Sequence, residues 1–155
     1  MADDAKKVMA RTLGDVLEGM AFTFIDSPED ADLRTDAAEF LHATIEFDGP
    51  SAGKLGIAAP QALCAELAAG VLGLDSDEGD ARESMSDTLG ELLNVTCGNF
   101  TTAMFGAEDL VDQSIPQVEK LDRPAWERLR HRPETMTFMV DDVPLIAHVA
   151  VKEKH

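Results

Sequence analysis

Cysteines, basic residues and long apolar runs are all scarce in this sequence, and each scarcity excludes a class of protein. Two cysteines occur among 155 residues, Cys64 and Cys97, in largely apolar stretches with no nearby Cys or His at metal-ligand spacing. This pattern argues against a disulfide scaffold and favours a reducing compartment. No apolar run approaches membrane-spanning length, and the N-terminus lacks the continuous apolar segment of a signal peptide. We therefore expect a cytoplasmic protein without a membrane partner.

Positive charge is scarce as well. The chain has 13 Lys and Arg against 30 Asp and Glu, a formal net charge of −17. Such a chain repels phosphate backbones, so nucleic acid is not an expected partner. Solubility explains this charge better than a specific docking role does. A local basic segment departs from the trend around Trp126. It either contacts an acidic partner or, as we prefer, covers the sheet as a solvated loop, and its basic residues are Arg123, Arg128, Arg130, His131 and Arg132.

The length and the 45% hydrophobic content fit one domain over residues 1–155. Spacing of apolar residues predicts an α+β fold, with periods of 3.6 in helices and 2 in strands. The acidic stretch 74–82 reads as a linker, because Gly79 and Ser86 stand where a calcium loop needs ligands. The predicted elements are a helix at 3–24, a hairpin at 39–47 and 54–59 joined by DGPSAG, helices at 61–73 and 82–105, an edge strand at 111–118 interrupted by Pro116, a helical turn opened by Asp122 and Pro124, and a hairpin of TMTFMV and LIAHVAV joined by DDVP.

Two segments of the chain resemble each other. LGDVLEGMAFTF at 13–24 and LGELLNVTCGNF at 89–100 share leucine, glycine and phenylalanine at matching places, and each helix is followed by a hairpin. We interpret this order as a duplication, with copies at about 3–60 and 82–152. The expected architecture is a pseudo-symmetric pair of helix–hairpin units, in which two long helices cover one antiparallel sheet.

The helix predicted at 82–105 carries a polar stripe of Asp87, Glu91, Asn94 and Gly98. These residues lie within a narrow sector at 100° per residue. An ordinary solvated face is the simplest interpretation. However, Asn and Gly are both unfavourable inside a helix, which favours a contact surface. The opposite face is predicted to pack on the domain through Met85, Leu89, Leu92, Leu93, Thr96, Phe100 and Ala103.

The pattern D87-x3-E91-x2-N94, followed by Gly98 and then Pro116, resembles the signature of the CheC/CheX/FliY phosphatases of bacterial chemotaxis. The resemblance spans almost the whole chain in element order. It implies that Glu91 and Asn94 are catalytic, that Asp87 and Gly98 contact the partner, and that the protein is a homodimer joined through sheet edges.

The first copy departs from the signature. It reads D15-x2-E18, without an asparagine, and a carboxylate at Glu18 would repel an anionic phosphoryl group. One intact E-x-x-N motif resembles CheX more than CheC. Whether Asp15 or Glu18 keeps any role stays open.

The resemblance implies a phosphatase acting on the aspartyl phosphate of the response regulator CheY. It implies no cofactor of the chain's own, since Mg²⁺ and a lysine belong to the partner receiver domain. Phosphoryl transfer has a loose transition state, so positioning and electrostatics suffice. Asn94 would orient the attacking water through its uncharged amide, and Glu91 would pair with the receiver lysine. The sequence does not say which receiver is the substrate, or whether another protein stimulates the activity.

Two alternatives from other classes stay open. A non-catalytic adaptor would bind a receiver domain or a flagellar switch protein without hydrolysing its phosphate. A structural acidic dimer would show no phosphorylation-dependent binding. Other enzyme classes find little support, because G-x-S-x-G, Walker and H-E-x-x-H motifs are absent. Cys64 and Cys97 read as small core residues, and His42 and His148, both in predicted strands, read as structural or exposed.

Overall fold

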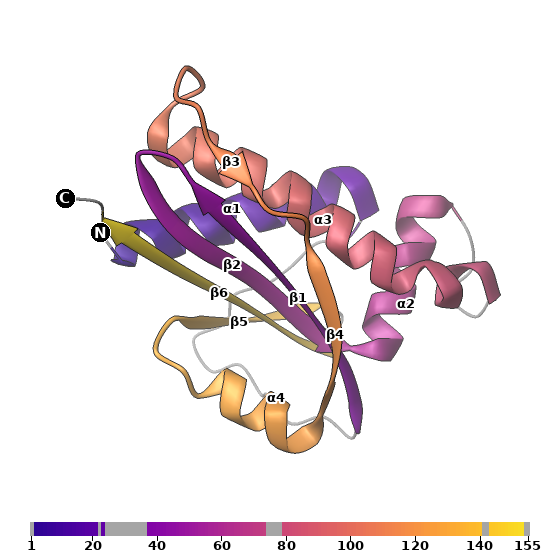
Figure 1. Cartoon of the computed structure of the whole chain (residues 1–155). Coiled ribbons are helices and arrows are strands. Elements are labelled where there is room, and N and C mark those ends of the chain that lie inside the picture. The colour runs from indigo at the N-terminus through magenta and orange to yellow at the C-terminus, as the bar shows by residue number, and fades with distance from the viewer. Residues whose placement is uncertain (1, 22, 24–36, 74–78, 141–142, 154–155) are drawn as a thin grey trace.

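The computed structural model describes residues 2–21, 23, 37–73, 79–140 and 143–153. Its strands form one sheet in the order β3–β1–β2–β6–β5, with β4 pairing β1 on the same edge as β3, and every pairing is antiparallel (Figure 1). The strands are β1 (Glu39–Asp48), β2 (Ser51–Pro60), β3 (Asp112–Gln113), β4 (Gln117–Asp122), β5 (Thr135–Val140) and β6 (Val143–Glu153). The helices are α1 (Ala2–Ala21), α2 (Gln61–Leu72), α3 (Gly79–Phe105) and α4 (Arg123–Arg130). The predicted α+β class is confirmed.

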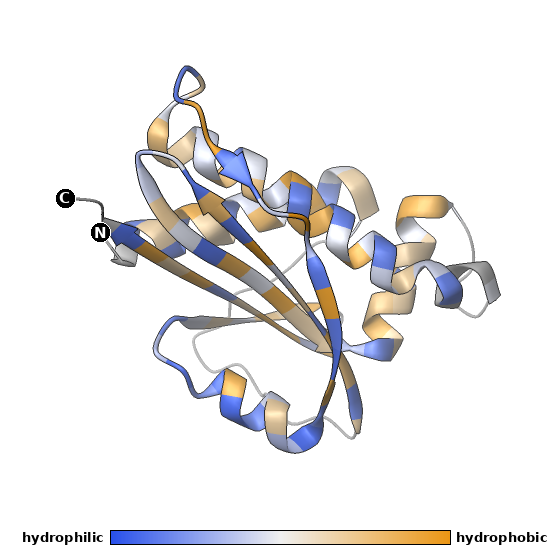
Figure 2. Cartoon of the chain, viewed as in Figure 1, coloured by the Kyte–Doolittle hydropathy of each residue, from blue (hydrophilic) through white to orange (hydrophobic). Residues whose placement is uncertain are grey.

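The two long helices, α1 and α3, pack on one face of the sheet (Figure 1). Hydrophobic and hydrophilic residues alternate along β1 (Figure 2), so that every second side chain enters the core beneath these helices. The helices contribute Met9, Leu13 and Leu17 from α1 and Leu89, Leu92 and Phe100 from α3, all buried. This packing fixes α3 and leaves its other side available for contacts.

The basic segment forms the helix α4 on the opposite face of the sheet. Asp122 caps it, since its Oδ1 accepts a hydrogen bond from the Ala125 N–H at 3.0 Å. Trp126 is fully buried and stacks on Phe40, with ring centroids 4.3 Å apart. The predicted turn is confirmed and extends to eight residues. The preferred interpretation of this segment as a solvated loop is wrong, because Trp126 and Leu129 anchor a helix to the sheet.

Several predicted boundaries differ from the observed ones. The first helix ends at Ala21 rather than 24, because the Thr23 N–H bonds back to the Leu17 carbonyl at 3.0 Å and closes the last turn. Phe24 lies outside the described residues. The helix predicted at 82–105 already begins at Gly79, within the stretch interpreted as a linker. Ala103, predicted on its buried face, is exposed.

In both hairpins the second strand begins earlier than predicted. β2 begins at Ser51, so the first turn shortens to Gly49 and Pro50. β6 begins at Val143, so Val143 and Pro144 belong to the strand and not to the turn. Longer strands bury more of their inner faces and pair more backbone groups. The hairpins themselves are confirmed, whereas the internal duplication stays a prediction.

The edge strand breaks at Pro116, as predicted. β3 pairs the end of β1 at Phe47 and Asp48, and β4 pairs its beginning from Glu39 to Thr44. Between them, the Ser114 N–H donates to the Glu46 carbonyl, and the Ser114 Oγ accepts from the Glu46 N–H, both at 2.9 Å. A proline lacks the N–H that a continuous ladder requires. The chain therefore bends away from β1 beside α3.

Candidate functional site

A groove of about 440 Å³ lies between the polar stripe of α3 and the broken edge strand. Asp87 and Glu91 are exposed along one wall, and Asn94 is half-buried farther along the same wall. The other wall is formed by residues 113–116 and Val118, and includes the bend at Pro116. The structure thus brings Asp87, Glu91 and Asn94 to one groove with Pro116.

Gly90 lies where α3 packs against the edge strand. A Cβ built on Gly90 would lie 3.5 Å from the Pro116 Cβ and 3.6 Å from the Val118 Cγ2, which is van der Waals contact. A larger side chain would push the two walls apart. Gly90 was not among the predicted site residues, although it stands next to Glu91 and a glycine costs about 1 kcal/mol in a helix relative to alanine.

Asn94 is held by Gln113, which was not among the predicted site residues. The Gln113 Nε2 donates to the Asn94 Oδ1 at 3.2 Å and approaches the Asn94 backbone carbonyl at 3.4 Å. Gly98, one turn beyond Asn94, is half-buried, and a Cβ there would lie 3.4 Å from the Gln113 Oε1. Gly98 therefore accommodates a side chain of this same chain. In the sequence, the position of Gln113 three residues before Pro116 was the signal that could have indicated it.

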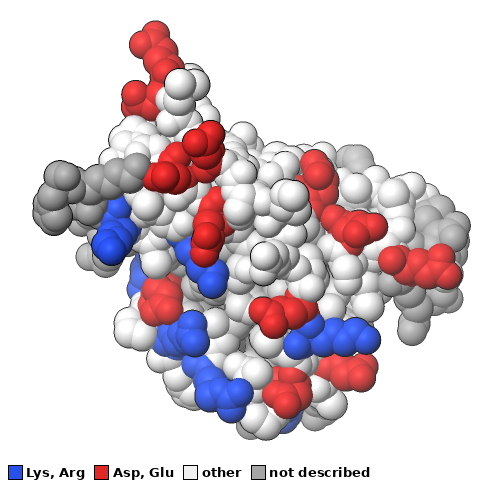
Figure 3. All heavy atoms as spheres, viewed as in Figure 1, with Lys and Arg blue, Asp and Glu red and all other residues white. Residues whose placement is uncertain are grey.

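The site is acidic. From residue 83 onward, α3 contains no lysine or arginine, and acidic side chains are the charged ones seen over its surface in Figure 3. Basic side chains gather instead over the strands and α4. Such a surface attracts a cation or a cationic partner group, while the neutral Asn94 amide can bond to water or to a phosphoryl oxygen. Among the described residues, no three His, Cys, Asp or Glu side chains converge in a way that could hold a metal.

Neither cysteine serves as a nucleophile in this groove. Both thiols are buried, and burial raises the pKa of Cys64 and that of Cys97 to about 12. A thiol at that pKa carries almost no thiolate near neutral pH. Their prediction as small core residues is confirmed.

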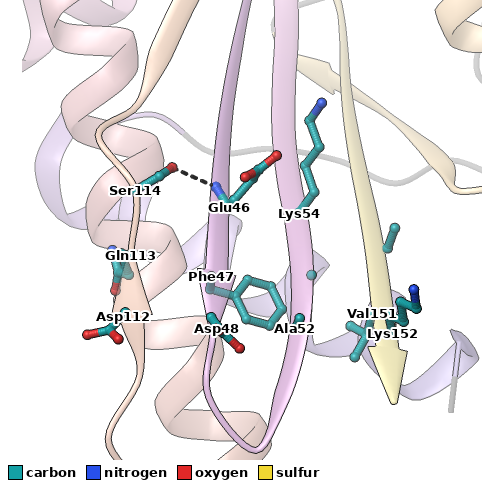
Figure 4. A pocket seen from close by; sticks show the side chains of 12 residues that line it. Glu46, Phe47, Asp48, Ala52, Lys54, Asp112, Gln113, Ser114, Val151 and Lys152 are labelled. Carbon is teal, nitrogen blue, oxygen red and sulfur yellow. Dashed lines mark hydrogen bonds between the residues drawn. The ribbon is translucent and has the colours of Figure 1, made fainter. Parts of the chain in front are cut away.

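A second, larger hollow of about 670 Å³ lies on the other side of β3 (Figure 4). Phe47 and Ala52 lie near its middle, and Glu46, Lys54 and Lys152 stand around it. Gln113 and Ser114 line both hollows, so their segment is the wall that separates them. None of the residues predicted for the site lies in this second hollow.

Comparison with known proteins relates this geometry to a family. The model of the family described as chemotaxis phosphatase CheX matches residues 41–135, a range that includes the polar stripe and Pro116. The chain belongs to this CheX family. A sequence comparison with curated proteins finds no match.

Solved structures of CheX proteins share the fold. CheX of Vibrio vulnificus is 19% identical, with 96% of this chain and 99% of that chain covered and a TM-score of 0.71. CheX of Desulfovibrio desulfuricans is 13% identical, with 96% and 99% covered and a TM-score of 0.70. CheX of Borrelia burgdorferi, solved in complex with CheY, BeF3 and Mg²⁺, is 16% identical, with 95% and 97% covered and a TM-score of 0.67.

Two features of this CheX-family chain lie outside the groove: the acidic residues of α1 and the composition of the helices. Asp15 and Glu18, the positions that the predicted duplication matches to the motif, are exposed on α1. None of the described helices is both long enough and apolar enough to span a membrane.

Proposed function

We propose that this protein hydrolyses the aspartyl phosphate of a CheY-type receiver domain, using the groove along α3. Its place in the family of chemotaxis phosphatases supports the reaction class. The Borrelia burgdorferi CheX complex with CheY, BeF3 and Mg²⁺ supports the partner and the presence of Mg²⁺ on the partner's side. The observation that carries the proposal is the neutral, half-buried Asn94 amide in a groove beside two exposed carboxylates.

Asn94 is proposed to position the attacking water. Its amide oxygen accepts a hydrogen bond from water, and its amide nitrogen donates to an oxygen of the phosphoryl group or the water. It adds no negative charge that would repel the phosphoryl oxygens. A hundredfold acceleration requires about 2.7 kcal/mol of barrier reduction, which one oriented water can supply.

Glu91 is proposed to fix the receiver over the groove. Its carboxylate is exposed one turn before Asn94, so a lysine of the receiver can reach it while Asn94 faces the phosphate. Charge pairs at an interface set orientation and association rate. Asp87, one turn farther away and also exposed, adds negative charge at the rim. Mg²⁺ bound to the receiver would be attracted by the same acidic surface.

Ile115 is proposed to give the interface its apolar contact. Its side chain is 85% exposed at the groove, on the wall opposite α3. An exposed isoleucine is unfavourable in water, and burying it against a receiver would stabilise the complex by about 2 kcal/mol. Apolar contact on one wall and negative charge on the other would together define the docking orientation.

Measurement of receiver dephosphorylation tests the proposal. A CheY-type receiver is phosphorylated with acetyl phosphate, freed of the donor, and followed for phosphate release with and without this protein. Faster release in proportion to the protein concentration is expected. Phosphorylation-dependent binding without faster release would contradict the enzyme and identify an adaptor, and the absence of both would exclude the receiver as the partner.

A further inference from the structure

We propose that Gln113 is a positioning residue for the reaction, and that it fixes the orientation of the Asn94 amide. This inference rests on the proposed function and adds a residue from outside the helical motif. Gln113 comes from β3, on the wall of the groove that faces α3. It is the residue whose side chain connects this wall to Asn94.

The hydrogen bonds determine which end of each amide faces the other. The Gln113 side chain approaches both the backbone carbonyl of Asn94 and its Oδ1, at 3.4 and 3.2 Å. A backbone carbonyl can only accept a hydrogen bond, so the NH₂ end of Gln113 must point toward α3. Because that NH₂ group can only donate, the oxygen of the Asn94 amide must face it. The amide of Asn94 is therefore fixed in one of its two orientations.

Gln113 is anchored to the sheet through its own backbone and through the next residue. Its backbone pairs with Phe47 in the ladder between β3 and β1. The next residue, Ser114, makes the two hydrogen bonds to the Glu46 backbone, one of which is drawn in Figure 4. On the helix side, the absence of a side chain at Gly98 leaves room for the Gln113 Oε1. The donor is therefore attached to the sheet, while the acceptor is attached to α3.

This contact orients the Asn94 amide for its proposed role and still leaves hydrogen-bonding positions on that amide available. A carbonyl oxygen has two lone pairs, so Oδ1 can accept from Gln113 and from water at the same time. The amide nitrogen of Asn94 bonds to none of the residues that the structure describes, and it can donate to a phosphoryl oxygen. Without Gln113, the amide would sample both orientations and more than one side-chain rotamer. Only part of that population would present the oxygen to the water.

Substitution of Gln113 tests the positioning role. In Gln113→Ala we expect kcat for receiver dephosphorylation to fall about tenfold with KM little changed, because orientation and not docking is lost. Gln117→Ala is the matched control, since Gln117 is an exposed glutamine on β4 that does not line the groove. It should retain the wild-type kcat. A raised KM with unchanged kcat in Gln113→Ala would contradict the proposal. A raised kcat would contradict it as well, because Gln113 would then hold Asn94 in an unproductive orientation.

An NMR measurement supplies a readout besides activity. The side-chain amide resonances of Asn94 should shift and broaden in Gln113→Ala and stay unchanged in Gln117→Ala. In a double-mutant cycle, Asn94→Ala combined with Gln113→Ala should be no slower than Asn94→Ala alone. If Asn94→Ala is inactive while Gln113→Ala keeps the wild-type kcat, the role of Gln113 fails and the proposed function stands. If Asn94→Ala itself is fully active, the proposed mechanism fails together with the role of Gln113, and if the wild type does not accelerate phosphate release, the proposed function fails.

Discussion

The Nε2 atoms of His42 and His148 lie 2.8 Å apart, although 106 residues separate them in the chain. His42 is on β1 and His148 on β6, with β2 between them. The rings meet over Gly56, where a Cβ would lie 2.0 Å from the His148 Nε2. This contact requires at least one ring to be neutral, because a hydrogen bond between the two nitrogens needs one lone pair.

Burial and the neighbouring His42 lower the pKa of His148 to about 3, and burial lowers the pKa of His42. Lys54 and Arg132 act in the same direction on both rings, while Glu119 opposes the shift at His42. In the unfolded chain a histidine takes up its proton near pH 6.5. Between about pH 6.5 and 3 the unfolded state therefore binds more protons, and stability falls as pH falls.

For His148 alone, we expect the free energy of unfolding to decrease by about 1.4 kcal/mol per pH unit below pH 6.5. Guanidinium unfolding at pH 7.5, 6.0 and 5.0 measures this slope. His148→Gln keeps a hydrogen-bonding side chain without titrating in this range, and its slope should be smaller than that of the wild type by about one proton. His131→Gln, at an exposed position after α4, is the control. Identical slopes in wild type and His148→Gln would contradict the expectation.

Ile115 and Leu110 offer a matched pair for testing the docking surface. Ile115 is 85% exposed at the groove, and Leu110 is 93% exposed outside its lining. Ile115→Ala should weaken binding of the phosphorylated receiver about tenfold through lost apolar burial. Leu110→Ala should leave the affinity unchanged. Titration calorimetry with a BeF3-activated receiver measures both, and equal effects of the two substitutions would remove Ile115 from the interface.

Glu91 should contribute affinity that depends on salt. Glu91→Gln keeps the shape of the side chain and removes the charge, so the receiver should bind about tenfold more weakly at low ionic strength. The difference from the wild type should shrink as salt screens the pair. Glu83→Gln, on an exposed part of the same helix outside the groove, controls for net charge. If Glu83→Gln matched Glu91→Gln at every salt concentration, the effect would come from net charge and not from a specific pair.

Gly98 should show opposite effects on stability and on rate. Gly98→Ala favours the helix by up to about 1 kcal/mol, which should raise the midpoint of thermal unfolding. The new Cβ would stand 3.4 Å from the Gln113 Oε1, at the short limit of ordinary contact, so we expect the Gln113 amide to shift by a small distance and kcat to fall. Gly19→Ala on α1 has no atom within 4 Å of the new Cβ. It should raise stability alone, and an undiminished kcat in Gly98→Ala would show that Gln113 does not need the space at Gly98.

Sequence periodicity predicted most of the elements because each one buries a regular face. The alternation of Leu41, Ala43, Ile45 and Phe47 predicted β1, and the core positions of these residues confirm it. Boundaries were less accurate, because backbone hydrogen bonds that no side-chain pattern records decide where an element ends. The bond from Thr23 to Leu17 that closes α1 is an example.

The candidate site was likewise predicted only in part. The polar stripe of α3 was visible because helical spacing places Asp87, Glu91 and Asn94 on one face. The opposite wall was not visible, because Gln113 reaches Asn94 only through the pairing of β3 with the end of β1. Likewise, His42 and His148 were predicted in separate strands, and only the strand order places them across Gly56. Contacts between distant segments depend on topology, which local patterns do not specify.

Asn94→Ala is the most direct test of the proposed mechanism. Asn94 is half-buried in the groove, whereas Asn99, exposed on the same helix, lies outside it and provides the control in Asn99→Ala. Single-turnover decay of a phosphorylated receiver should be at least hundredfold slower with Asn94→Ala than with the wild type, a loss of about 2.7 kcal/mol. Asn99→Ala should match the wild type. If Asn94→Ala retains the wild-type rate while remaining folded, Asn94 does not position the water and the proposed mechanism is wrong.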